Sequence, residues 1–326
     1  MKKTVKITGI IVGGIILAVI SCIVYVKVFL PNVSQAPAIA IKVTPELIER
    51  GKYMANNVMV CMDCHSTRNW NEFSGPLVNG TLGKGGDVFD ASMGFPGVYY
   101  ASNITPAGIG NYSDGEIFRA ITCGVKKNGD PIFPVMPHAN YGLLDKEDIK
   151  AVIAYIRTIE PIENKVPSSH SDFPMNIIIN TMPKEAALSK RPDKHQAVAY
   201  GGYLVNAAAC RDCHTPFEKG SYDAERILAG GRQFKMPGGT LTSSNLTPDN
   251  ETGIGQWSQD AFIRRFTIYR DSAAAHQNID PQKDFNTIMP WTMYANMTDE
   301  DLGAIYQYLK TLKPNHNPTI KFTSAN

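Results

Sequence analysis

The sequence predicts a mainly α-helical chain in which an N-terminal membrane-spanning helix precedes two tandem helical domains. Three observations lead to this prediction: a long apolar run near the N-terminus, an internal repeat, and helix-capping patterns at matching places in both repeats. A length of 326 residues accommodates two domains of roughly 100 to 150 residues each. Because 32 Lys plus Arg face 30 Asp plus Glu, there is no excess of basic residues for nucleic-acid binding, and nucleic acid is not an expected partner.

The apolar run extends from Ile7 to Leu30 and is interrupted only by small residues, Tyr25 and Lys27. At about 1.5 Å rise per residue, a helix of this length crosses a hydrocarbon core of about 30 Å, so residues 1–30 are predicted to be a transmembrane anchor. Positive charges before the run favour a cytoplasmic N-terminus, which predicts a single-pass protein of the bacterial inner membrane with periplasmic domains. These charges are Lys2, Lys3 and Lys6.

Two alternatives to a spanning anchor remain open. A cleaved signal peptide would have a shorter apolar region and a small-residue cleavage site. The stretch Val19-Ile20-Ser21-Cys22 is similar to a lipoprotein processing box, which would make Cys22 a lipid-anchored N-terminus. The residues after Cys22 stay apolar through Leu30, and this favours the spanning helix.

The rest of the chain contains one unit written twice. The segment Ser102-Asn103-Ile104-Thr105-Pro106 matches residues 244–248, and Met136-Pro137 matches Met289-Pro290. A self-similarity of this length indicates tandem duplication. It divides the chain into three parts, which are a first domain at 44–162, a proline-rich linker at 163–192 and a second domain at 193–316.

Capping patterns predict helices at matching positions of the two units. Thr44 before a proline is typical of an N-cap, and Ser113 with Glu116 forms a capping-box pattern. Asp145 and Thr298 are the expected N-caps of the last helix in each unit. Apolar residues then recur at i, i+3, i+4 and i+7, which predicts helices packed on a core. The Gly-, Pro- and Asn-rich segments between them are expected to be loops.

Each unit contains Cys-x-x-Cys-His, the attachment signature of c-type haem, in which two thiols bond to the porphyrin and the imidazole reaches the iron. A zinc site would place its second Cys pair about 15 to 20 residues after the first, whereas 149 residues separate Cys61 from Cys210. A thioredoxin motif needs a βαβ setting that neither copy has. The sequence therefore predicts two covalently attached haem c groups, bound by Cys61, Cys64, His65, Cys210, Cys213 and His214.

A second axial ligand must come from a distant loop, and twelve methionines are available. We predict Met136 and Met289, because each lies nine residues before the expected cap of the last helix and precedes a stiffening proline. A methionine ligand raises the reduction potential relative to a second imidazole. Met93 and Met236 form a rival pair. His138 is an alternative ligand in the first unit, although the second unit has a tryptophan at that position.

Several polar residues have two interpretations. Asn103 and Asn245 suit either a hydrogen bond to a haem propionate or a plain turn. Arg68, Arg119 and Arg264 are candidate partners of propionates because guanidinium matches carboxylate, but each alone is more typical of a surface arginine.

These motifs together resemble a membrane-anchored dihaem c-type cytochrome, similar to the cytochrome c subunits of bacterial periplasmic alcohol, gluconate and aldehyde dehydrogenases. The resemblance covers residues from about 44 to 314 and rests on both haem motifs, both Ser-Asn-hydrophobic-Thr-Pro segments and both Met-Pro loops. It implies two tandem cytochrome c domains whose irons are bound by histidine and methionine. Many such subunits carry three haems whereas this chain has two motifs, so the resemblance does not identify the partner.

The expected function is a relay of single electrons from a respiratory donor, either a dehydrogenase or a quinol-oxidising complex, to a terminal oxidase or a soluble acceptor. In this hypothesis the chain is not an enzyme and has no catalytic residue, since its work is to bury the haem and fix the axial ligands. The alternative is a dihaem cytochrome c peroxidase, which needs an iron with an open coordination position. Matching Met-Pro loops in both units favour the relay.

Overall fold

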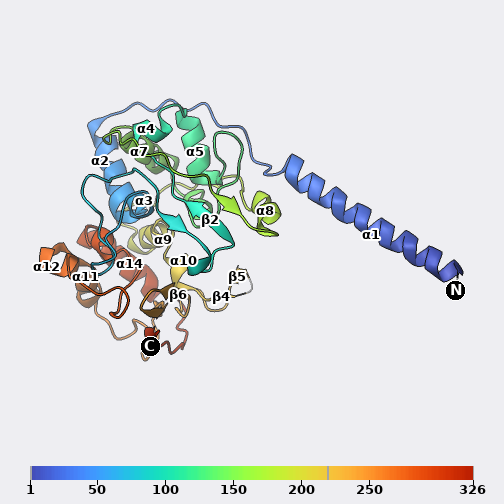
Figure 1. Cartoon of the computed structure of the whole chain (residues 1–326). Coiled ribbons are helices and arrows are strands. Elements are labelled where there is room, and N and C mark those ends of the chain that lie inside the picture. Colours follow the sequence, from blue (N-terminus) through green and yellow to red (C-terminus); the bar gives the residue numbers. More distant parts are fainter. Residues whose placement is uncertain (1, 219, 326) are drawn as a thin grey trace.

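The computed structural model describes residues 2–218 and 220–325, so residue 1, where the predicted anchor begins, lies outside it. Helix α1 (Lys2–Phe29) projects away from the body that the rest of the chain forms (Figure 1). Its segment Thr4–Phe29 is long and apolar enough to cross a membrane, a property that signal sequences share. The predicted apolar N-terminal helix is thus present, and nearly all of its described side chains are exposed.

In the N-terminal half, residues 44–162, the first helix packs against the last. Helix α2 (Pro45–Tyr53) begins after the predicted cap Thr44, and α7 (Lys146–Ile156) begins after the predicted cap Asp145. The two helices cross so closely at Gly51 that a Cβ there would overlap a backbone carbonyl of α7. Glycine at this position therefore allows the crossing.

The C-terminal half, residues 193–316, repeats this arrangement. Helix α9 (Ala197–Ala207) packs against α14 (Asp299–Lys310), which begins after the predicted cap Thr298. Gly201 stands where the first pair has its crossing glycine, and a Cβ there would overlap a backbone carbonyl of α14. The duplication seen in the sequence is therefore a duplication of helix packing.

Further helices, separated by loops, connect these pairs. The capping box predicted at Ser113 and Glu116 is present, with both of its hydrogen bonds. These further helices are η1 (Met54–Val58), α3 (Cys61–Cys64), η2 (Ala91–Met93), α4 (Pro106–Ile109), α5 (Asp114–Cys123), α6 (His138–Tyr141), α8 (Met175–Ile178), η3 (Ile179–Thr181), α10 (Cys210–His214), α11 (Gln259–Thr267), η4 (Ile268–Arg270), α12 (Ser272–Ala275) and α13 (Trp291–Tyr294).

Short antiparallel strands lie in segments that the sequence predicts to be loops. They are too short for an alternating pattern to distinguish them from loops, and glycines interrupt them. Strand order is β1-β2-β3 in one sheet, β4-β5 in a second and β6-β7-β8 in a third. The strands are β1 (Val88–Phe89), β2 (Gly97–Tyr100), β3 (His170–Ser171), β4 (Phe217–Glu218), β5 (Ser221–Tyr222), β6 (Gln233–Met236), β7 (Gly239–Thr242) and β8 (Phe322–Ser324).

The predicted linker, residues 163–192, is packed on the N-terminal half. Its strand β3 pairs with β2, and its helix α8 lies against α1. The Lys27 ammonium donates a hydrogen bond to the carbonyl oxygen of Asn176 at 2.6 Å, and Arg191 forms an ion pair with Asp148. This segment therefore connects α1, the N-terminal half and the start of α9.

The two halves share one apolar core and are joined by reciprocal polar contacts. The hydroxyl of Tyr53 donates a hydrogen bond to Asp301 Oδ2 at 2.6 Å, and the hydroxyl of Tyr203 donates one to Asp148 Oδ2 at 2.6 Å. Each contact links the first helix of one half to the last helix of the other. The halves are thus related by an approximate two-fold arrangement of equivalent residues.

Candidate haem-binding sites

Both Cys-x-x-Cys-His motifs begin at a backbone turn in the left-handed region. Val60 has φ 46° just before α3, and Ala209 has φ 50° just before α10. This conformation is uncommon for residues with a side chain and occurs often at functional sites. Because the following turn is helical, the thiols of Cys61 and Cys64 lie three residues apart on one side of the chain.

The histidine of each motif is oriented by a backbone carbonyl. His65 Nδ1 lies 2.6 Å from the carbonyl oxygen of Ser102, and His214 Nδ1 lies 2.7 Å from that of Ser244. A carbonyl only accepts, so Nδ1 carries the proton and Nε2 keeps its lone pair for a metal. Burial lowers the pKa of both imidazoles, which favours this neutral form, although the hydrogen bond opposes the shift.

A glycine at matching positions completes each histidine turn, and the sequence interpretation missed it. The backbone N–H of Gly85 donates to the carbonyl oxygen of His65 at 2.9 Å, and that of Gly230 donates to the carbonyl oxygen of His214 at 2.7 Å. Gly85 has φ 69°, and a Cβ there would overlap the Ser102 backbone. The signal available in the sequence was a Gly-Gly pair at the same place in both units.

Asn103 and Asn245 are used within their own turns. Asn103 Oδ1 accepts hydrogen bonds from the backbone N–H and the hydroxyl of Thr105, at 2.9 and 2.7 Å. Its Nδ2 donates to the carbonyl oxygen of Ile162 at 2.8 Å. Asn245 makes the equivalent contacts in the second unit. The structure therefore favours the turn over a propionate contact.

Met136 and Met289 occupy equivalent turns beside the core. Each side chain is partly buried and packs against the apolar cluster. The rival Met93 is 39% exposed, and neither it nor Met236 belongs to that cluster of described residues. This placement favours Met136 and Met289, and their role as ligands stays a prediction.

A buried tyrosine ties the segment after each methionine turn to the segment before the haem motif. The hydroxyl of Tyr141 donates to the carbonyl oxygen of Met59 at 3.0 Å. The hydroxyl of Tyr294 donates to the carbonyl oxygen of Ala208 at 2.9 Å. The two sides of each predicted haem pocket are thus connected by one hydrogen bond at the same place in both halves.

His138 is 2% exposed, and its ring packs against the backbone of Gly124. Burial lowers its pKa to about 4, so the imidazole is neutral. Its Nε2 has no hydrogen-bond partner among the described residues. His138 therefore remains the alternative ligand of the first unit.

The three candidate arginines differ from one another. Arg68 is not a surface residue: it is paired with Asp63 at 2.9 Å and donates to the carbonyl oxygen of Ser74 at 2.6 Å. Arg119 donates to a backbone carbonyl, while its buried Nε lacks a partner within residues 2–218 and 220–325. Arg264 is exposed. Arg68 organises a loop, a role that its sequence context did not indicate.

The motif thiols are not tied up in disulfides. All six cysteines are free. Burial raises the pKa of Cys61 to about 12 and that of Cys213 to about 11, so both are protonated thiols in this structure. In the part of the chain that the structure describes, no group of three or more His, Cys, Asp or Glu side chains is placed to hold a metal ion.

The two motifs approach each other where the halves meet. Asn140, in α6 after the Met136 turn, donates a hydrogen bond to Asp212 Oδ2 of the second motif at 3.0 Å. Asn206 Nδ2 donates to the carbonyl oxygen of Asn140 at 2.9 Å. The charge of Asp63, in the first motif, contributes to the raised pKa of Cys213 after burial and Asp212. Both sites thus border the same interface.

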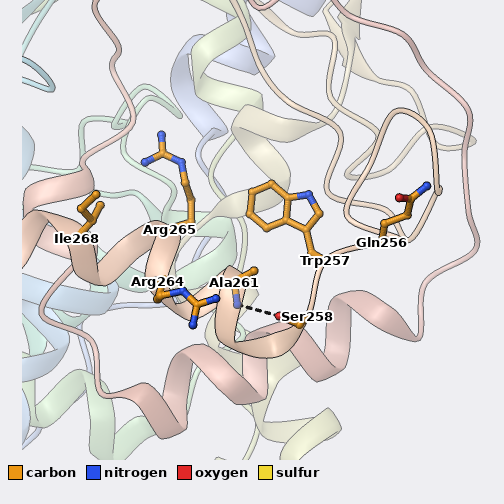
Figure 2. Close-up of a pocket in the computed structure, with 7 residues that line it drawn as sticks. All are labelled: Gln256, Trp257, Ser258, Ala261, Arg264, Arg265 and Ile268. Atoms are coloured by element: carbon orange, nitrogen blue, oxygen red, sulfur yellow. Dashed lines mark hydrogen bonds between the residues drawn. The ribbon is translucent and has the colours of Figure 1, made fainter.

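A surface hollow lies beside the second methionine turn. Figure 2 shows it on the outer face of α11, between Trp257 and Ile268, with Arg265 at its wall. The guanidinium of Arg265 lies 4.0 Å from the ring centre of Trp291, two residues after Met289. The hollow therefore borders the C-terminal site from the solvent side.

Comparison with known proteins identifies the class of the C-terminal half. Residues 198–313 match the cytochrome c family. The chain therefore contains a cytochrome c domain, and its residues fit a covalently bound haem c.

Several relatives are cytochrome subunits of dehydrogenases, which confirms the resemblance of the sequence to such subunits. The gluconate 2-dehydrogenase cytochrome c subunit of Pantoea cypripedii is 31% identical over 82% of this chain and 59% of its own length. The alcohol dehydrogenase (quinone) cytochrome c subunit of Gluconobacter oxydans is 27% identical over 82% and 55%. The fructose dehydrogenase cytochrome subunit of Gluconobacter japonicus is 30% identical over 81% and 52%. The chain thus spans little more than half the length of these relatives.

Proposed function

We propose that the protein is a membrane-attached dihaem c-type cytochrome that relays single electrons. The observation that carries this proposal is the geometry shared by the two motifs, each with a left-handed residue before the first cysteine and a histidine held by a carbonyl. Residues 44–162 and 193–316 form two cytochrome c domains in this proposal, with one haem each. Residues 163–192 connect them.

The chain's own residues hold the two haems. Four thiols would form the covalent links to haem, and two histidines and two methionines would bind the irons through nitrogen and sulfur. Bound haem supplies the iron that changes between ferrous and ferric states. The residues are Cys61, Cys64, His65 and Met136 for the first centre, and Cys210, Cys213, His214 and Met289 for the second.

Proximity of the motifs supports transfer of electrons between the two centres. Asn140 and Asp212 connect the two sites directly, and the core is continuous across the interface. In this proposal, the packed interface would hold the two centres at a fixed separation. The protein does no bond chemistry on a substrate in this proposal.

The partners follow from the relatives and from α1. The donor is a dehydrogenase, as the names of the relatives suggest, or a quinol-oxidising complex, and the acceptor is a terminal oxidase or a soluble carrier. Helix α1 anchors the chain in the inner membrane with the domains in the periplasm. The relatives give the peroxidase alternative no support.

Mass spectrometry of the denatured holoprotein tests the proposal. We expect two covalent haem adducts, with one lost in a Cys61→Ala/Cys64→Ala variant and the other lost in Cys210→Ala/Cys213→Ala. A single adduct in the unaltered protein would refute the dihaem assignment. Fast catalytic reoxidation of the reduced protein by hydrogen peroxide would favour the peroxidase instead.

A further inference from the structure

One loop of the N-terminal half is longer than its counterpart and reaches the other half. It begins after Ser66, whose Oγ accepts a hydrogen bond from Gly83 N–H at 3.1 Å. The equivalent bond in the C-terminal half runs from Leu228 N–H to Thr215 Oγ1 at 3.0 Å. These bonds enclose residues 67–82 in the first case and the shorter stretch 216–227 in the second. We call residues 67–82 the crossing loop.

The crossing loop pairs with the segment that leads to Met289. The backbone N–H of Phe73 donates to the carbonyl oxygen of Gln277 at 2.8 Å, and that of Ile279 donates to the carbonyl oxygen of Asn71 at 2.9 Å. A hydrogen bond between His276 Nδ1 and the Glu72 carboxylate, at 2.6 Å, lies beside these bonds. The segment 268–288 is itself longer than residues 124–135, which precede Met136. The two long segments therefore meet across the interface.

Ser74, at the tip of the crossing loop, contacts the methionine turn itself. Its hydroxyl donates to the carbonyl oxygen of Met289 at 2.6 Å and accepts from the backbone N–H of Trp291 at 3.0 Å. Its own N–H donates to Asn286 Oδ1 at 2.9 Å. Ser74 is 0% exposed, so these bonds are shielded from water.

The backbone of Ser74 is held in an uncommon conformation. Its φ is 63°, which costs free energy for a residue with a side chain. Arg68 fixes this turn by donating to the carbonyl oxygens of Ser74 and Gly75, at 2.6 and 2.9 Å. The crossing loop is thus rigid where it touches the other half.

The methionine turn of the N-terminal half lacks such a contact. Within residues 2–218 and 220–325, the backbone of Met136 bonds only to its own loop: its N–H donates to the carbonyl oxygen of Phe133 at 3.2 Å, and its carbonyl accepts from His138 N–H at 2.7 Å. Among residues 216–218 and 220–227 of the shorter stretch, none bonds to the Met136 turn as Ser74 bonds to the Met289 turn. Among the described residues, the opposite half therefore bonds directly to the methionine turn only in the second site, whereas in the first site it reaches Asn140, four residues further along.

We propose that Ser74 is a positioning residue for the second iron centre, holding the Met289 turn so that its sulfur stays on the iron. This inference rests on the proposed function, which assigns Met289 as that ligand. A neutral thioether is a weak ligand, so its occupancy depends on how firmly its turn is held. The N-terminal half thereby sets the coordination of the C-terminal centre.

The experiment uses the full-length holoprotein with Ser74→Ala, which removes the hydroxyl, and Ser74→Gly, which removes it and also suits a φ of 63°. The absorption of sulfur-to-iron charge transfer and the midpoint potential of each haem are measured by spectroelectrochemical titration. We expect loss of most of this band at the second centre and a lower potential there, with the first centre unchanged. Ser66→Ala is the matched control, because Ser66 is also a buried serine whose hydroxyl bonds within its own half.

Three outcomes would overturn the inference: an unchanged second centre in both Ser74 variants, an equal change at both centres, or an equal change of the second centre in Ser66→Ala. A Met289→Ala variant separates these failures from failure of the proposed function. If Met289→Ala keeps the band of the second centre, the ligand assignment is wrong. If it removes the band while both Ser74 variants keep it, only the positioning role is wrong.

Discussion

The N-terminal and C-terminal halves have the same framework but different surroundings. Both cross their first and last helices at a glycine, and both orient a histidine through a carbonyl. In the N-terminal half, the extended segment before α2 covers α5 so closely that a Cβ on Gly115 would overlap the Pro37 carbonyl. After the equivalent α11, Ile268 at the start of η4 is 56% exposed and borders a hollow (Figure 2). Duplication thus preserved the backbone geometry of the two Cys-x-x-Cys-His motifs, while the connecting segments made their surroundings unequal.

The buried aspartates at the interface differ in the same way. Asp148 is paired with Arg50 at 2.9 Å and with Arg191, in addition to the hydroxyl of Tyr203. Burial favours protonation of Asp148, but the hydrogen bonds and charge of Arg50 outweigh it, so its pKa lies below the ordinary value. Asp301 has the 3.4 Å contact with Lys194, and its Oδ1 has no hydrogen-bond partner among the described residues. The two aspartates are therefore equivalent in position, but Asp148 is more strongly paired with cations than Asp301 is.

Loss of an axial methionine is expected to have the largest effect. Met136→Ala and Met289→Ala should each abolish the sulfur-to-iron charge-transfer band of one haem and lower its reduction potential, because sulfur ligation raises that potential. Near-infrared absorption with redox titration measures both quantities. His138→Ala is the companion variant: if it alters the first centre while Met136→Ala does not, the first iron has two imidazole ligands and the halves differ in ligand type.

Replacement of the glycine at each helix crossing by alanine is expected to destabilise both halves equally. Gly51→Ala and Gly201→Ala each place a Cβ on a backbone carbonyl, which should cost about 3 kcal/mol of unfolding free energy, at the upper end of overpacking costs. Denaturant unfolding of the holoprotein measures this loss. In the control Gly202→Ala, the atoms nearest to the new Cβ belong to the ring of Tyr308, and this side chain can move to make room. A much smaller loss for one of the two crossing variants would show that the halves are not packed alike.

Removal of the interface carboxylates should destabilise the protein by different amounts in the two halves. Asp148→Asn is expected to lower the unfolding free energy by about 2 kcal/mol, because two arginines lose their buried partner. Asp301→Asn should cost about 1 kcal/mol, since the tyrosine contact can persist with the amide. Denaturant unfolding of both variants checks the order, and equal losses would contradict the inequality described above.

The smallest expected effect is a pH dependence that passes through Asp148. Its pKa is lowered in the folded state, so its contribution is fully present above the unfolded value of about 3.9 and is lost as pH falls through the folded pKa. Denaturant unfolding between about pH 5 and pH 3 should show a steeper loss for the unaltered protein than for Asp148→Asn. Parallel curves would show that this carboxylate does not contribute.

Local signals in the sequence predicted local structure well. The caps at Thr44, Asp145 and Thr298 and the capping box at Ser113 are confirmed because they depend on contacts within one helical turn. The strands were missed, because segments of two to four residues carry too little pattern.

The features that distinguish the halves were not predictable in this way. The position of Ser74 on the Met289 turn depends on two long loops meeting across the interface, and no periodicity records such a meeting. The burial of Arg68 follows from the same loop. The assignment of the histidines and cysteines rests on a short motif that specifies the chemistry of haem attachment, and it stays a prediction.

The helix crossings at glycine also determine the order in which the two halves can fold as the chain is synthesised. Helix α2 packs on α7, so both helices of the first crossing are present once residue 156 has been synthesised. Domains fold as units and the N-terminal one first. The first helix pair can therefore form before the second half is complete, whereas the contacts of Ser74 need residues 286–291.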